Sequence, residues 1–175
     1  MSNYRRNYIS GGTYFFTVNI LERKKSLLID HIDELRSAIR VTKKNKPFHI
    51  DAWVILPDHM HCIWTLPKND SDYSSRWREI KKTFSKSLPK IERRSKTRLK
   101  NKERGIWQRR FWEHTIRDEL DYQRHMDYLH FNPVKHGLVD AVHKWQYSTF
   151  HHLVEQGVYP VNWGEDVILD AGERK

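Results

Sequence analysis

The strongest constraint on the fold is a pair of extended segments that follow each other almost without a gap. Residues 48–56 and 59–66 are rich in apolar, β-branched and aromatic side chains, and Pro57-Asp58 separates them. Proline and aspartate favour turns, so the two segments are expected to form a hairpin or a tight corner between neighbouring strands. An antiparallel sheet is therefore expected.

Further strands and helices are predicted before and after this pair. Residues 13–20 follow two glycines and are typical of a strand after a turn, and residues 107–116 indicate another strand. Apolar residues at helical spacing, each run followed by a proline, predict helices over about 30–44, 77–88 and 118–131. This order predicts an α+β protein with an antiparallel sheet and helices packed on one of its faces.

The length of 175 residues is that of one domain. We expect this domain to cover residues 1–150, with a mobile basic excursion at about 90–105 and a C-terminal tail over 151–175. No stretch approaches the roughly 20 apolar residues that span a bilayer, and residues 1–12 lack an apolar signal core. Cys62 is the single cysteine, which excludes an internal disulfide and fits a reducing compartment. These features predict a cytoplasmic protein without a membrane segment.

The positive charge is concentrated in one segment. The formal net charge is +10, and residues 76–110 hold 15 lysines and arginines against three glutamates, so the rest of the chain is slightly acidic. A solvated, partly disordered face is one interpretation of such a run. Interleaved aromatic residues favour nucleic acid instead, because flat rings beside cations suit bases stacked next to phosphates. They are Trp77, Phe84, Trp107, Phe111 and Trp112, and some of them must be core.

His59 and His61 form the first candidate site. Alternate residues of a strand share a face, so the two imidazoles would point the same way and could hold one divalent ion. A pair without function on a solvent-facing strand is the alternative. The apolar residues on both sides of the pair favour the first interpretation, because they place it where an apolar strand begins.

Tyr128 and Asn132 form the second candidate site, near the end of the last long helix. They are four residues apart and so lie on one helix face, whereas Tyr122 is a poorer partner for Asn132 and the better core candidate. A packing role for Tyr128 is the alternative.

The two candidate sites together suggest one reaction. A phenol is a poor nucleophile at neutral pH and needs an activated electrophile, which a phosphodiester on a divalent ion supplies. In-line attack would then leave a covalent phosphotyrosine. Two imidazoles and an amide oxygen suit Mg²⁺ or Mn²⁺, although imidazole also accepts zinc.

With these residues in place, the sequence resembles the REP-associated tyrosine transposases, within the wider group of single-tyrosine HUH nucleases. The matching blocks are residues 4–6 with 11–17, residues 56–61, residues 107–114 and residues 128–138. They occur in the family's order and extend from residue 4 to about residue 150. The combined match is specific, although each short block alone is not.

The resemblance implies a ferredoxin-like core whose central strand carries His59 and His61, faced by a helix that carries the nucleophile Tyr128. Asn132 matches the position that completes the family's metal site. It further implies cleavage of single-stranded DNA to a 5′-phosphotyrosine and a free 3′-OH, on palindromic repeats folded as hairpins beside a short guide sequence. A monomer is the favoured state in this branch of the family.

Cations outside the candidate sites are expected to bind the DNA. Arg5 and Arg6 could read base edges in the guide or a groove, because arginine to guanine is the commonest specific contact. The candidates for contact with the phosphate backbone are Lys81, Lys82, Lys86, Arg93, Arg94, Arg109 and Arg110.

Two other functions compete with a nuclease. A hairpin-binding protein without catalysis is disfavoured because both imidazoles, the phenol and the amide are present. A zinc-dependent hydrolase that uses His59, His61 and a further histidine such as His114 lacks a placed carboxylate base and leaves the basic segment unexplained.

Overall fold

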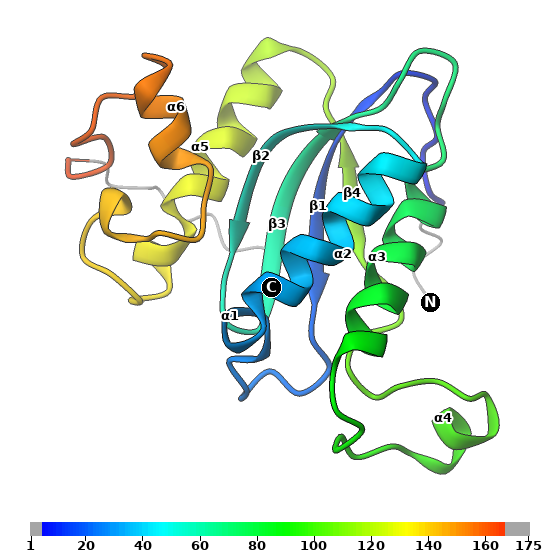
Figure 1. Ribbon diagram of the computed structural model, residues 1–175. Helices are drawn as coiled ribbons and strands as arrows, with labels where there is room; N and C mark the ends of the chain where they lie inside the picture. Colours follow the sequence, from blue (N-terminus) through cyan, green and yellow to red (C-terminus); the bar gives the residue numbers. More distant parts are fainter. Residues whose placement is uncertain (1–4, 167–175) are drawn as a thin grey trace.

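A computed structural model describes residues 5–166 of the chain as one antiparallel sheet with helices on both sides (Figure 1). The four strands are β1 (Thr13–Asn19), β2 (His49–Ile55), β3 (His59–Thr65) and β4 (Trp112–Thr115), in the spatial order β2-β3-β1-β4. The helices are α1 (Leu27–Asp30), α2 (Ile32–Asn45), α3 (Tyr73–Ser87), α4 (Lys96–Lys100), α5 (Glu119–Lys135), the 3-10 turn η1 (Val142–Lys144) and α6 (Phe150–Glu155). The α+β class and the antiparallel sheet are thus confirmed.

The expected hairpin forms one side of the sheet, with β2 at the edge and β3 in the interior. β2 pairs with β3 across the turn after Leu56, whose N–H donates to the carbonyl of His59 at 2.8 Å. β3 also pairs with β1, which places Thr17 opposite His61 and Asn19 opposite His59. β3 therefore has a hydrogen-bonded neighbour on each side and is held in a fixed register.

Helices cover both faces of the sheet, so the expectation that they pack on one face is wrong. α2 and α3 lie over one face, where Tyr14 and Phe16 of β1 join the larger core. α5 and α6 pack with the other face, where Phe15 of β1 and Ile63 of β3 belong to a second core. The reason is that the strands carry apolar residues at successive positions, so both faces need cover.

The two faces of β3 differ in chemistry. Met60 and Cys62 point into the larger core with α2 and α3, and both are buried. Their neighbours His59 and His61 point to the opposite face, on the side of α5. A strand that appears uniformly buried therefore separates a hydrophobic core from a polar cluster.

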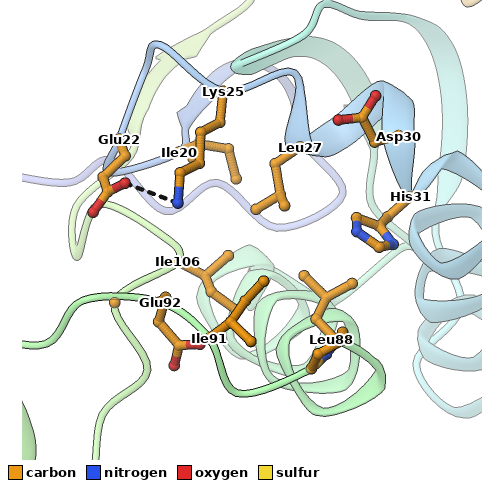
Figure 2. Close-up of a pocket in the computed structure, with 12 residues that line it drawn as sticks. Ile20, Glu22, Lys25, Leu27, Asp30, His31, Leu88, Ile91, Glu92 and Ile106 are labelled. Atoms are coloured by element: carbon orange, nitrogen blue, oxygen red, sulfur yellow. Dashed lines mark ion pairs between the residues drawn. The ribbon is translucent and has the colours of Figure 1, made fainter.

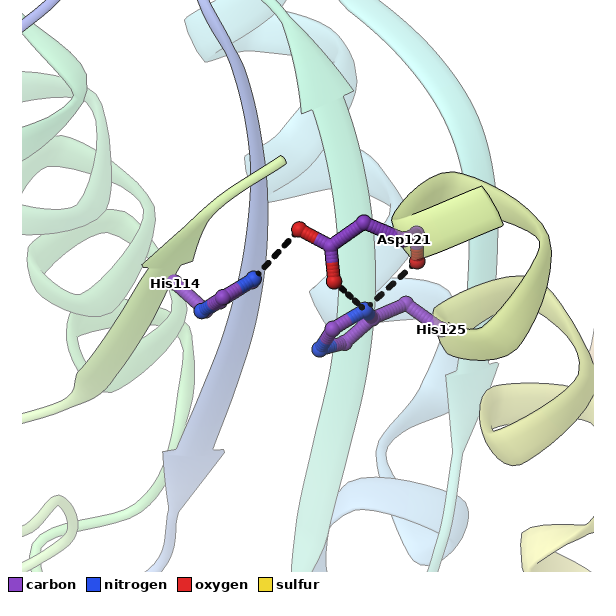
Figure 3. Close-up of side chains that lie close together, drawn as sticks. All are labelled: His114, Asp121 and His125. Carbon is purple, nitrogen blue, oxygen red and sulfur yellow. Dashed lines mark hydrogen bonds and ion pairs between the residues drawn. The ribbon is translucent and has the colours of Figure 1, made fainter. Parts of the chain in front are cut away.

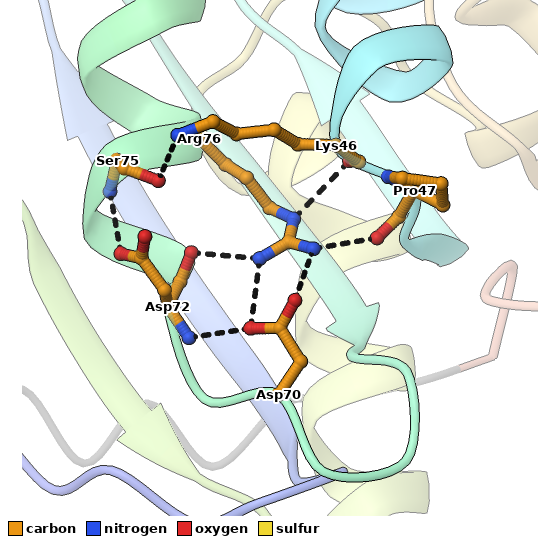
Figure 4. A network of polar contacts seen from close by, with 6 residues as sticks. All are labelled: Lys46, Pro47, Asp70, Asp72, Ser75 and Arg76. Atoms are coloured by element: carbon orange, nitrogen blue, oxygen red, sulfur yellow. Dashed lines mark hydrogen bonds and ion pairs between the residues drawn. The ribbon is translucent and has the colours of Figure 1, made fainter.

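Arg76 belongs to the basic segment but is used inside the fold. Its guanidinium is buried and binds the Asp70 carboxylate at 2.6 and 3.1 Å, and it donates to the carbonyls of Lys46, Pro47 and Asp72 (Figure 4). Asp72 caps α3 by accepting from the N–H of Ser75. This network joins the end of α2 to the start of α3. The Asp70 side chain is 32% exposed, so solvent screens this ion pair in part.

The basic excursion and the described residues after 150 are more ordered than the sequence predicted. The basic excursion at 90–105 contains α4, and Arg104 holds it by pairing with Glu92 and donating to the carbonyl of Ser85. Packing also continues past residue 150, because Leu153 and Tyr159 lie in the second core. The last nine residues of the expected C-terminal tail, 167–175, lie outside the described residues. Across residues 5–166, no helix combines the length and apolar character that a bilayer crossing requires.

Candidate active site

The structure brings His59, His61 and Tyr128 together from β3 and α5. The rings of the two histidines are 5.1 Å apart, centre to centre, and the ring of Tyr128 is 5.5 Å from that of His61. Both imidazoles are buried, whereas the tyrosine is 37% exposed. A phenol that solvent can reach thus lies against two imidazoles that are held inside the protein.

Hydrogen bonds orient both imidazoles. Nδ1 of His61 lies 2.9 Å from the hydroxyl of Thr17, its cross-strand partner, and Nδ1 of His59 lies 2.6 Å from the Asp58 carboxylate. Asp58 in turn accepts from Nε of Arg23 at 2.6 Å. Because Nδ1 is engaged in each ring, Nε2 is the nitrogen that can bind a cation. Such partners fix the tautomer and the direction of a metal-binding histidine.

Burial keeps His61 neutral. It lowers the pKa of this imidazole well below its ordinary value, and the adjacent His59 and His136 lower it further. A neutral imidazole is the form that binds a metal ion.

Asn132 lies one turn beyond Tyr128 on α5 and is fully buried. It is close enough to His61 to oppose the fall in that residue's pKa, yet neither its Oδ1 nor its Nδ2 reaches a partner with hydrogen-bond geometry. An unsatisfied buried amide costs about 1–3 kcal/mol and calls for an explanation, of which a bound ion is one. The donor set of two imidazoles and an amide oxygen fits a divalent cation.

Tyr128 lines an open pocket, whereas Tyr122 packs against the second core. The pocket beside Tyr128 has a volume of about 450 Å³ and is lined by Phe15, Thr17, Trp112, Arg124, His125 and Tyr128. Tyr122 packs against the second core, its hydroxyl donates to Asp51 at 3.4 Å, and burial raises its pKa to about 12. The expectation that Tyr122 is a core aromatic is confirmed.

His136 is a neighbour of the site that sequence reasoning missed. Its ring lies 5.1 Å from that of His59, because α5 ends at Lys135 and the chain remains close to β3 there. Its spacing of four residues from Asn132 was the available signal. Thr17 and Asp58 were missed as well, and only the strand register and the turn reveal them.

His114 does not join His59 and His61. It lies with Asp121 and His125 in a separate cluster (Figure 3): His114 Nε2 donates to Asp121 Oδ2 at 2.8 Å, and Nδ1 of His125 lies 2.8 Å from the Asp121 carbonyl oxygen. The zinc hydrolase built on His59, His61 and His114 thus lacks its third ligand.

The predicted DNA-binding cations are dispersed. A groove of about 760 Å³ between α3 and the basic excursion is lined by Lys81, Lys82, Lys86, Arg94 and Arg109, among others. Arg93 lines a smaller pocket nearby with Arg94, while Arg5 and Arg110 are exposed. Arg6 does not extend freely, because its guanidinium lies 4.0 Å from the ring centre of Phe111.

Lys81 is half-buried at the groove, and most of the interleaved aromatic residues face the interior. Lys81 donates to the carbonyl of Gln108 at 3.0 Å, and burial lowers its pKa to about 8. Trp77, Phe84 and Trp107 are buried in the larger core, whereas Trp112 is 48% exposed. Of the aromatic residues expected to stack on bases, Trp112 is therefore the accessible one.

A further pocket lies away from all predicted site residues. It has a volume of about 300 Å³ between the α1 region and the segment after α3, and Leu27, Leu88 and Ile106 contribute to its apolar lining (Figure 2). An ion pair of Glu22 with Lys25 lies at its edge. The residues that line this pocket do not include His59, His61, Tyr128 or Asn132.

Residues 8–132 match the family model described as "Transposase IS200 like". The match includes His59, His61, Tyr128 and Asn132. The chain therefore belongs to the IS200-like transposase family.

A related protein and a related solved structure narrow the assignment within this family. The chain is 54% identical over 175 residues to the REP-associated tyrosine transposase of Escherichia coli (strain K12), with 99% of this chain and 98% of that protein covered. A solved structure of a REP-associated tyrosine transposase bound to a REP hairpin superposes with a TM-score of 0.83 at 51% identity, over 100% of this chain and 99% of that one. Within the family, the chain is a tyrosine transposase of the REP-associated group.

Proposed function

We propose that this tyrosine transposase is a metal-dependent single-stranded DNA endonuclease and strand transferase that acts on palindromic-repeat hairpins through a covalent 5′-phosphotyrosine. The observation that carries the proposal is the exposed phenol of Tyr128 beside the buried, oriented imidazole of His61. The hairpin substrate is supported by the related structure, which holds a REP hairpin.

Tyr128 is the nucleophile in this proposal. Its oxygen forms a bond to the scissile phosphorus while the bond from phosphorus to the 3′ oxygen breaks in line with it. The phenolic proton passes to water, and the 3′ oxygen takes a proton from water, so the products are a 5′-phosphotyrosine on the protein and a free 3′-OH. Attack of a 3′-OH on the phosphotyrosine reverses the step and rejoins DNA. The open pocket beside Tyr128 gives the strand access to the phenol.

His59, His61 and Asn132 would hold Mg²⁺ or Mn²⁺. When bound, such an ion supplies Lewis-acid polarisation of the scissile phosphate. Thr17 and Asp58 keep the two imidazoles turned with Nε2 available, and burial keeps His61 neutral. These residues prepare the site before DNA arrives.

The basic groove would bind the DNA backbone. Lys82, Lys86 and Arg109 are exposed cations that line it, and neutralisation of phosphates by such residues makes affinity depend on salt. We place the protein in the cytoplasm, where its DNA substrate would be, and favour a monomer because one chain contains the nucleophile and all three proposed ligands.

The test is a covalent-adduct assay. Hairpin DNA from the repeats of the host genome, with its single-stranded flanks, is incubated with Mg²⁺ or Mn²⁺ and run on a denaturing gel. We expect a slower protein band that contains DNA, absent in Tyr128→Phe and in EDTA, and present in the control Tyr122→Phe. An adduct that persists in Tyr128→Phe would show that another residue is the nucleophile. Hairpin binding with no adduct under any metal would show a binding protein without catalysis.

A further inference from the structure

We propose that Trp112 divides a binding site for the single-stranded DNA next to the scissile phosphate, with one nucleobase in each of the two pockets that this residue lines. The inference deepens the proposed function and rests on it, since it names where the cleaved strand lies. Trp112, Arg117, Arg124, His114 and His125 form this site, which we call the flank site.

Trp112 is exposed in a segment whose other tryptophans are not. It is 48% exposed, whereas Trp77 and Trp107 are buried. It lies on β4, which pairs with β1 at the edge of the sheet, and its register partner is Thr17 beside the candidate metal site. A large exposed aromatic ring near a proposed nucleophile provides a surface on which a base can stack.

Two pockets meet at this indole. The first, of about 450 Å³, is lined by Trp112 together with Tyr128, Arg124 and His125. The second, of about 580 Å³, is lined by Trp112 together with Arg5, His114 and Arg117. The side chain of Trp112 therefore separates a space that Tyr128 shares from a space farther along the strand. A chain of nucleotides attacked at Tyr128 would pass from one to the other.

Asp121 holds two imidazole rings, those of His114 and His125, in a stack with the indole of Trp112. The indole is stacked on His114 at 5.9 Å and 11°, and His114 is stacked on His125 at 4.5 Å and 16°. Asp121 is buried and binds one nitrogen of each imidazole (Figure 3). Each imidazole thus keeps its other nitrogen for a base edge, and the stack is ordered before DNA binds.

The same contacts argue against a metal ion in this cluster. Oδ2 of Asp121 already accepts from His114 and, at 3.1 Å each, from the backbone N–H and Nε of Arg117. A guanidinium bonded to the carboxylate oxygen repels a cation that would bind there. The arrangement is that of a carboxylate that orients two imidazoles.

The charges that line the two pockets select an anionic chain. Arg124 lies in the first pocket and Arg5 and Arg117 in the second, and all three are exposed. The acidic residue in the lining, Glu113, is 2% exposed. In single-stranded DNA, phosphates alternate with bases. The arginines are suited to bind the phosphates, and the aromatic rings are suited to stack on the bases.

The test compares two DNA probes in a Tyr128→Phe background without divalent metal, so that cleavage plays no part. One probe is the repeat hairpin alone, and the other is the same hairpin with the single-stranded flank that contains the cleavage position. We expect Trp112→Ala to weaken binding of the flanked probe roughly 10- to 100-fold and to leave the hairpin probe unchanged. Trp112→Phe should restore most of the loss. Leu120→Ala, an exposed apolar residue of α5 that lines neither pocket, is the matched control.

A second readout locates the bases directly. With 2-aminopurine on either side of the scissile phosphate, binding should quench its fluorescence in the Tyr128→Phe protein and not in the variant that also carries Trp112→Ala. Equal loss of both probes, or no loss of the flanked probe, would overturn the flank site. Failure of the proposed function gives a different result, since the adduct assay would then be negative while the flank preference and its dependence on Trp112 remain.

Discussion

The ring of Tyr128 lies 5.5 Å from that of His61, at an interplanar angle of 71°. Phe15 of β1 lies beneath both, with its ring 5.4 Å from that of His61 and 6.0 Å from that of Tyr128. The second core thus supports the proposed nucleophile and a proposed metal ligand on one shared aromatic side chain. This packing connects the stability of the fold to the geometry of the site, and the following predictions separate the two.

Asn132→Leu should abolish adduct formation without destabilising the protein. The buried amide has no partner at hydrogen-bond geometry, so an apolar side chain of similar size removes an unsatisfied group worth about 1–3 kcal/mol. Thermal unfolding in EDTA should show a Tm equal to or above that of the unmodified protein. Mn²⁺ should raise the Tm of the unmodified protein and not that of the variant. A large fall in Tm in EDTA would mean that the amide is needed for folding.

Thr17→Val should weaken metal binding about 10- to 100-fold, because the hydroxyl that orients His61 is lost while the shape is kept. The measurement is the Mn²⁺ concentration that gives half-maximal adduct. Thr13→Val on the same strand is the control, since its hydroxyl contacts Thr65 and not a histidine. Equal metal dependence in the two variants would remove Thr17 from the site.

The pKa of Lys81 predicts a rise in stability with pH. Burial lowers the pKa of its amine in the folded state to about 8, while the unfolded chain keeps the ordinary value near 10.5. Between these values the unfolded state binds more protons, so this group adds stability as pH rises and loses it as pH falls through about 8. From about pH 7.5 to about pH 10 the gain is about 2 kcal/mol. Urea unfolding across this range should show that gain relative to Lys81→Met, and parallel curves for the two proteins would contradict it.

Lys82→Ala and Lys86→Ala should each reduce the salt dependence of hairpin binding. Both lysines are exposed and line the basic groove, and each phosphate contact contributes about one unit to the slope of log affinity against log salt concentration. Lys44→Ala, an exposed lysine of α2 that does not line the groove, is the control. Unchanged slopes in the groove variants would place the DNA elsewhere.

The local patterns predicted the four strands and the helices α2, α3 and α5, because each of these carries its own signal, whereas the short helices α1, α4 and α6 were not predicted and the strand expected over 107–116 is limited to Trp112–Thr115. The hairpin at Pro57-Asp58, the pairing of His59 with His61 on one face and the shared face of Tyr128 and Asn132 all follow from the periods of strands and helices. The helix over 118–131 was predicted, but its packing on the second face was not, since an apolar run does not show whether one or both faces of a strand are covered.

Long-range partners could not be predicted from local patterns. Thr17 reaches His61 through the register between β1 and β3, and His136 reaches His59 through the position at which α5 ends. The burial of Arg76 and the partial burial of Lys81 within a basic run are equally invisible in composition, because they depend on which helix face meets its neighbours.

The alternation along β3 has a consequence for how this protein could lose its chemistry. A shift of β3 by one residue against β1 would turn Met60 and Cys62 toward α5. Both imidazoles would then point into the larger hydrophobic core with α2 and α3. The hydrogen-bonded register between β1 and β3 thus determines which face of the sheet carries the two histidines. Substitutions that weaken this pairing should abolish activity before they unfold the protein.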